Sequence, residues 1–150
     1  MEYEVTEVPD ATYAVLRQTA EFSEVPQLIP AFIEQVGAWA REAGAITGPP
    51  ASITSMTGDG RLNVASGWAV DGSQSPPEPI ELAVLPGGRA AVYVHVGPYD
   101  TLPDVYQELG TALASAGLQP GAAPREIYES DPDEVPDPQQ YVTRIIWPLG

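Results

Sequence analysis

The sequence predicts an α+β fold with two pseudo-symmetric repeats, each a β-hairpin, a helix and a second β-hairpin, giving antiparallel sheet of about eight strands and two helices. Three observations predict it: two segments with apolar residues spaced three and four apart, several short segments of alternating apolar and polar residues, and a match between the two halves of the chain. The 150 residues, 43% of them hydrophobic, are enough to bury the core of one domain.

The first half contains four segments that alternate as half-buried strands do. These predicted strands are residues 3–8, 12–16, 51–56 and 62–70. Pro9-Asp10 separates the first two, and a Gly-Asp-Gly turn joins the last two as a hairpin. Between the pairs, an apolar stripe predicts a helix near residues 24–43 that Gly44 stops.

The second half repeats this order. Its predicted strands are residues 80–85, 89–96, 124–128 and 141–149. A Pro-Gly-Gly turn is expected to join the first two as a hairpin, and an apolar stripe predicts a helix near residues 101–116 that ends at Gly117. Residues 131–138 contain four acids and three prolines and are expected to form a rigid acidic loop.

The two halves match at one constant offset, with Pro26 in the place of Pro103 and the preceding strands aligned. We therefore interpret the chain as one domain made of a repeat over residues 1–71, a polar connector over 72–79 and a second repeat over 80–150. A groove between the repeats is the expected ligand site, because clefts between units are where ligands usually bind.

Glu126 is the residue that we expect to carry the function. Side chains alternate along a strand, so Glu126 and Tyr128 share one face and Ile127 takes the other. If Ile127 lies in the core, the acid and the phenol share the opposite surface. Burial would raise the pKa of such a carboxyl group, and ring faces attract organic cations. The alternative is an ordinary solvated residue of an edge strand. The first half has Ser52 and Thr54 at these places, so the site is expected to hold a single acid.

Composition limits the partners. Six arginines, no lysine and 21 acids give a net charge of −15, which repels nucleic acid and anionic membranes but attracts cationic or neutral aromatic small molecules, unless the charge serves solubility alone. With no cysteine and the single His95, thiolate and histidine metal sites are excluded, and no cofactor is expected. We expect His95 to make a structural hydrogen bond.

The start of the chain lacks a signal peptide and no apolar run could cross a membrane, so we expect a cytoplasmic protein, and a monomer.

Three motifs carry a resemblance to a known family. They are Gly97-Pro98-Tyr99 before the second helix, residues 125–132, which read Arg-Glu-Ile-Tyr-Glu-Ser-Asp-Pro, and the closing strand 141–149. Together with the order of elements, they resemble the GyrI-like, or AraC-type effector-binding, small-molecule-binding domain over nearly the whole chain. The resemblance implies that Glu126 is the family's central acid, which faces bound aromatic cations in drug-sensing members, and that Tyr141 is a pocket tyrosine.

Aromatic residues are expected to line the pocket around Glu126, because flat ligands need ring faces on which to stack. These candidates are Tyr128, Tyr141, Trp68, Tyr106, Phe32, Trp39 and Tyr99. Trp68, Phe32 and Tyr106 could equally be ordinary core residues. Trp39 lies on the apolar stripe of its helix, so we interpret it as a core residue first and a pocket wall second.

Three functions remain open. The first is a stand-alone domain that binds or sequesters flat, hydrophobic, often cationic compounds. The second, implied by the resemblance, is a hydrolase that opens cyclopropane rings of DNA-alkylating natural products. Glu126 would position or deprotonate the attacking water, and Tyr141 would orient the substrate or donate to the developing oxyanion. The third is an inhibitor of a larger enzyme that acts through its acidic surface.

Overall fold

The computed structural model describes residues 1–131 and 134–150 and contains eight strands and two α-helices in these ranges. The strands are β1 (Glu4–Val8), β2 (Ala11–Ala20), β3 (Ile46–Met56), β4 (Leu62–Val70), β5 (Glu81–Leu85), β6 (Gly88–Val96), β7 (Arg125–Tyr128) and β8 (Val142–Pro148). The helices are α1 (Val25–Ala43) and α2 (Leu102–Ser115). The predicted α+β class and the positions of both helices are confirmed. Pro132 and Asp133 of the predicted acidic loop lie outside the described residues.

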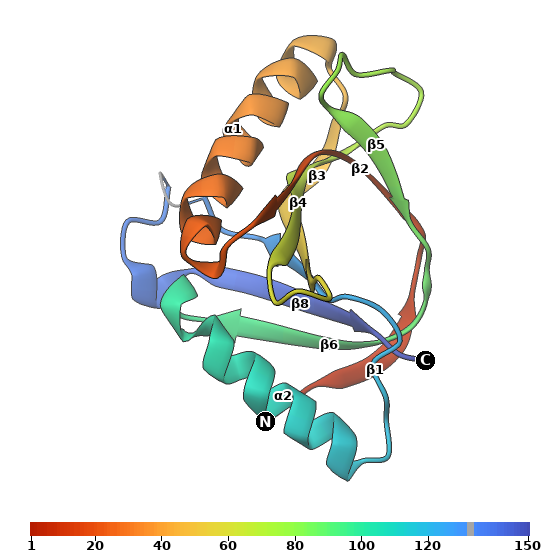
Figure 1. The fold of residues 1–150 in the computed structure, drawn as a ribbon, viewed down its shortest axis with the longest axis vertical. Helices are drawn as coiled ribbons and strands as arrows, with labels where there is room; N and C mark the ends of the chain where they lie inside the picture. The colour runs from red at the N-terminus through yellow and green to blue at the C-terminus, as the bar shows by residue number, and fades with distance from the viewer. Residues whose placement is uncertain (132–133) are drawn as a thin grey trace. The chain divides into compact units, whose positions relative to one another are not determined.

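The chain forms two compact units, coloured mainly red to green and green to blue in Figure 1. One unit spans residues 9–87, and its antiparallel strands have the order β3-β4-β2-β5. The other comprises residues 1–8 and 88–150, and its antiparallel strands have the order β1-β6-β8-β7.

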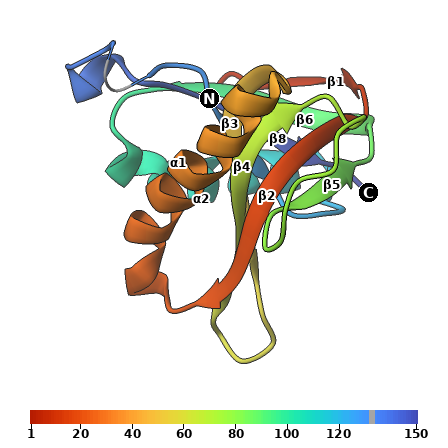
Figure 2. The same ribbon diagram turned by 90° about the horizontal axis from the view of Figure 1, so that it is seen from above.

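In the unit of residues 9–87, α1 packs its apolar side against β2 and β4, as Figure 2 shows. Val36 and Ala40 of the helix are fully buried in a core that includes Ala14 and Val70 from the strands. The helix ends at Gly44, whose φ of 66° is left-handed and therefore favours glycine over a residue with a Cβ. The hairpin of β3 and β4 has the predicted turn, with Met56 opposite Leu62.

In the other unit, α2 runs across β6 and β8 (Figure 1). The helix residues at three- and four-residue spacing are the ones that the sequence predicted to face inward, and they meet Ala91 of β6 and Ile145 of β8. These buried helix residues are Leu102, Val105, Leu109 and Leu113. This helix and these strands position the site described below.

Two of the four predicted hairpins are wrong. β1 does not pair with β2 but with β6, and β5 does not pair with β6 but with β2. The reason lies in the two links, because a two-residue hairpin turn needs a positive φ at its first central residue, and the ring of Pro9 or Pro86 fixes φ near −65°. Each link instead carries the chain from one unit into the other. The two links are held together, since Gly87 donates its backbone N–H to the Asp10 carboxylate.

Replacing Gly110 with alanine is expected to stabilise the protein. Gly110 lies inside α2, where glycine costs about 0.5–1 kcal/mol relative to alanine. A Cβ at this position would lie 3.8 Å from the ring of Trp147, which is an ordinary van der Waals contact. We expect Gly110→Ala to raise the free energy of unfolding by about 0.5 kcal/mol or more in urea denaturation. A loss of stability would mean that the packing of α2 at this point requires a residue without a side chain.

Candidate functional site

Glu126 lies on the face of β7 that meets the core. Its cross-strand neighbour on β8 is Ile145, a fully buried residue of the core beneath α2, and Tyr128 lies opposite Thr143 in the same way. Directly opposed residues of an antiparallel pair point to the same side, so the acid and the phenol share the helix-covered face. The sequence left open an arrangement with Ile127 in the core and Glu126 on the opposite surface, and the strand pairing excludes this arrangement. Glu126 stands partly buried at the margin of the core itself.

Two phenols hold the carboxylate. Tyr106, on α2, donates its hydroxyl to Glu126 Oε2 at 2.8 Å. Tyr128, two residues along the same strand, donates to Oε1 at 3.0 Å. Tyr106 comes from the partly buried side of the helix, one residue after buried Val105, which is why it reaches over the edge of the core to the strand. Each carboxylate oxygen thus has a neutral donor from a different element.

Burial raises the pKa of Glu126 above its ordinary value, because a charged carboxylate loses solvation between helix and sheet. The hydrogen bonds from Tyr106 and Tyr128 and the nearby His95 act in the opposite direction and only partly offset this. Burial and the Glu126 carboxylate also raise the pKa of Tyr106 well above its ordinary range, so this phenol keeps its proton and remains a donor. The site therefore contains one desolvated acid with uncharged donors.

A cluster of tyrosine rings adjoins the acid. Tyr99, in the turn that leads into α2, stacks on Tyr141 with ring centroids 5.0 Å apart and meets the ring of Tyr128 edge-on at 5.6 Å. Burial, followed by the neighbouring Tyr141, Asp131 and Glu126, raises the pKa of Tyr99. Tyr99 is nevertheless 36% exposed, so the cluster presents aromatic surface to solvent beside the partly buried carboxylate.

His95 fixes the start of α2. Its Nε2 lies 2.9 Å from Thr101 Oγ1, which donates to the carbonyl oxygen of Pro98 at 2.7 Å. The expected structural hydrogen bond of His95 is present. Opposite His95 on β8 lies Thr143, whose fully buried hydroxyl has no hydrogen-bond partner among the residues that the structure describes.

The structure brings together five of the eight predicted site residues, which are Glu126, Tyr106, Tyr128, Tyr99 and Tyr141. The other three, Phe32, Trp39 and Trp68, belong to the unit of residues 9–87 and pack against its core. The indole N–H of Trp68 donates to the carbonyl oxygen of Ile33 at 2.8 Å, and Arg41 lies over its ring. Their place in a ligand pocket remains a prediction.

Trp147 was not among the predicted site residues. Its ring meets Tyr106 edge-on, with centroids 5.8 Å apart, and so supports the phenol that binds Glu126. The signal was the alternation of the closing strand, because Trp147 is two residues beyond Ile145 and shares its face.

No group of three or more metal-ligating side chains occurs in the described ranges, 1–131 and 134–150. Over the same ranges, neither α-helix has the length and hydropathy needed to cross a membrane. The side chains around Glu126 provide one acid, phenol hydroxyls and aromatic ring faces. Such a set can bind an organic cation or accept a proton from water.

Solved structures of similar fold cover almost the entire chain. The C-terminal domain of EcmrR superposes with a TM-score of 0.79 at 23% identity, over 99% of this chain and 97% of that domain. A longer EcmrR chain, in a complex with DNA, matches with a TM-score of 0.80 at 24% identity, and this chain spans only 57% of it.

Two further structures carry functional descriptions. SAV2435 bound to tetraphenylphosphonium has a TM-score of 0.70 at 16% identity, over 100% of this chain and 94% of SAV2435. A hydrolase from Listeria innocua has a TM-score of 0.63 at 15% identity, over 99% of this chain and 92% of the hydrolase.

At these identities the structures establish a shared fold. A search of curated proteins finds no match to the sequence. The sequence model of the GyrI-like small molecule binding domain, in contrast, matches residues 1–149. The chain is therefore a member of the GyrI-like small-molecule-binding domain family.

Proposed function

We propose that this protein binds flat or propeller-shaped hydrophobic organic cations at Glu126, as a drug-binding or sequestering domain. The observation that carries the proposal is the partly buried carboxylate, which is held by Tyr106 and Tyr128 and has no cationic side chain in hydrogen-bond contact within the described residues. A lipophilic cation would supply the missing positive charge at little desolvation cost of its own. The net charge of −15 favours its approach.

The aromatic surface beside the acid suits the rest of such a ligand. Tyr99 and Tyr141 offer stacked rings, and cations bind to ring faces with about 0.5–2 kcal/mol depending on desolvation. The similar SAV2435 structure contains tetraphenylphosphonium, a cation of this class. In this proposal Phe32, Trp39 and Trp68 are further candidates for ligand contact.

A second candidate is hydrolysis of an electrophilic cyclopropane, and the raised pKa of Glu126 favours it because a general base works best when its pKa is close to the working pH. Glu126 would take a proton from water as the water oxygen bonds to a ring carbon. The strained C–C bond would break toward a conjugated carbonyl, whose developing oxyanion Tyr141 would stabilise. The likeness in fold to a Listeria innocua hydrolase is compatible with this chemistry.

One experiment separates the two functions. The protein is titrated with tetraphenylphosphonium by calorimetry and is incubated, at catalytic amounts, with a cyclopropane-bearing alkylator followed by mass spectrometry. Saturable binding of the cation without conversion of the alkylator is the expected result. Multiple turnovers of ring opening would establish the hydrolase instead. If the protein shows no binding of the cation and no turnover of the alkylator, both functions are refuted.

A further inference from the structure

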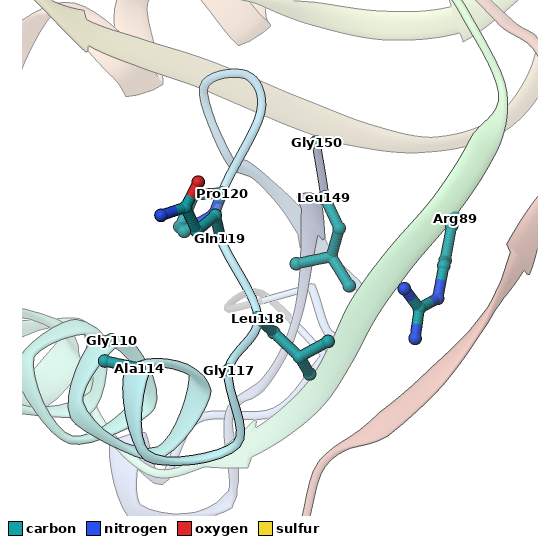
Figure 3. Close-up of a pocket in the computed structure, with 9 residues that line it drawn as sticks. All are labelled: Arg89, Gly110, Ala114, Gly117, Leu118, Gln119, Pro120, Leu149 and Gly150. Carbon is teal, nitrogen blue, oxygen red and sulfur yellow. The ribbon is translucent and has the colours of Figure 1, made fainter.

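A cavity lies beside the last turns of α2, at the other end of this helix from the tyrosine cluster and within the same unit. It has a volume of about 440 Å³, which is within the range of small-molecule sites. Its lining comes from four segments, namely the last turns of α2, the link that follows the helix, the start of β6 and the two residues that follow β8. Figure 3 shows Leu118, Leu149 and Arg89 approaching one space from these segments.

Backbone hydrogen bonds hold the frame of this cavity. Leu149 donates its N–H to the carbonyl oxygen of Arg89 at 2.9 Å, and Gly150 donates to that of Gln119 at 2.8 Å. Gly121 closes the same link by donating to Pro148 at 2.8 Å. The lining segments are thus tied to one another, and the cavity is preformed.

Arg89 gives the cavity its charge. Its side chain is exposed, and within the described residues no carboxylate lies within ion-pair distance of it, although Glu7 is its cross-strand neighbour. Three other arginines, Arg17, Arg61 and Arg144, each form an ion pair with an acid. In a chain with 21 acids, Arg89 is therefore a cation whose fork of donors is open toward the cavity.

The rest of the lining is apolar or small. Leu118 and Leu149 provide hydrophobic contact, and Gly110 and Ala114 leave the helix surface low, so that a ring can approach the backbone of α2. We propose that this cavity is a second binding site, and that it takes a small hydrophobic monocarboxylate, with the carboxylate on Arg89 and the apolar body between Leu118 and Leu149. A guanidinium binds a carboxylate through two parallel hydrogen bonds, which an alcohol or an amine cannot form.

This site differs in charge preference from the one at Glu126. Tyr106 and Gly110 lie one turn apart on α2, and both adjoin the ring of Trp147. Neither Tyr106 nor Trp147 is among the residues that line the cavity. A carboxylate at Arg89 and a cation at Glu126 would occupy separate places on the same unit, and the proposal does not depend on the function of Glu126.

The test uses 1-naphthoate as the anion, with 1-naphthalenemethanol as its neutral counterpart, in calorimetry and in amide chemical-shift titrations of the full chain. Naphthoate should bind and shift the amide signals of Leu118, Gln119 and Leu149, and the alcohol should bind at least about tenfold more weakly. Arg89→Gln should weaken naphthoate by about tenfold or more, whereas Arg17→Gln, which removes the same charge from the other unit, should change it less than about twofold.

A second variant tests the cavity itself. Gly110→Leu places a side chain in the cavity and improves helix propensity, so it should fold and lose naphthoate binding. Tetraphenylphosphonium should not shift the amide signals of Leu118 and Leu149. The proposal is overturned if naphthoate causes no shifts at these amides, if the alcohol binds as well as the acid, or if folded Arg89→Gln or Gly110→Leu binds naphthoate like the parent.

Discussion

Glu126→Gln is expected to weaken the binding of tetraphenylphosphonium by about 1–3 kcal/mol, the range for hydrogen-bonding contacts with a charged group. Glutamine keeps the shape of the side chain, and its oxygen can still accept from one of the two phenols while its NH2 group donates to the other. It removes the negative charge that the cation needs. If the protein is a hydrolase, the same change removes the base and should abolish ring opening. Calorimetric titration of both proteins measures the difference in affinity.

The same substitution should change how stability depends on pH. Because burial raises the pKa of Glu126 in the folded state, the protonated acid is favoured there, and its contribution to stability is complete below the unfolded pKa of roughly 4.3. That contribution is lost as the pH rises through the raised folded pKa. In Glu126→Gln, stability should not fall in this way as the pH rises, and the variant should be as stable as the parent or more stable at neutral pH. Thermal melting of both proteins from about pH 4 to about pH 9 measures this difference.

Cation binding should depend on pH in the opposite sense. Only the ionised carboxylate attracts a cation, so the affinity of the parent should rise with pH through the folded pKa of Glu126, and that of Glu126→Gln should stay flat. Glu108→Gln is the matched control, because Glu108 is an exposed acid on α2 of the same unit. If both variants bind like the parent, Glu126 is a structural acid and the proposed cation site is wrong.

The sequence predicted the elements of this fold better than their pairing. Apolar spacing and stop glycines placed both helices within one or two residues, since they depend on local periodicity. The exchange of β1 and β5 between the units was missed, because alternation is identical whichever strand is the partner. The one sequence feature that argues against these two hairpins is the proline in each two-residue link, Pro9 and Pro86, because a proline disfavours a tight hairpin turn there.

The site shows a similar division. Alternation paired Glu126 with Tyr128, the family resemblance implied Tyr141, and Tyr99 was an aromatic candidate. All four lie in one cluster. Tyr106 was expected as a pocket wall, but its hydrogen bond to Glu126 depends on how α2 is set on the sheet, which no local pattern encodes. The same is true of the side of the strand, because alternation separates Glu126 from Ile127 without saying which of them meets the helix.

Replacing both phenols, as Tyr106→Phe with Tyr128→Phe, should move the pH dependence of cation binding upward. Each hydrogen bond to a charged acceptor contributes about 1.5–3 kcal/mol, and both bonds favour the ionised form of Glu126 and lower its pKa. Without them burial acts with less opposition, so the acid keeps its proton to higher pH. His95, which lies near the carboxylate and also lowers the pKa of Glu126, is unchanged in this variant.

The measurement is the tetraphenylphosphonium affinity of parent and double variant as a function of pH. We expect the rise in affinity to occur at higher pH in the variant, with affinity at pH 7 lower by about tenfold or more and with a plateau at high pH as strong as in the parent, because the carboxylate and the rings remain. Tyr93→Phe is the control, since Tyr93 packs against the same core and is not a donor to Glu126. An unmoved pH profile in the double variant would show that the two hydrogen bonds do not set the ionisation of Glu126, whereas a lower plateau with an unmoved profile would assign the hydroxyls to ligand contact instead.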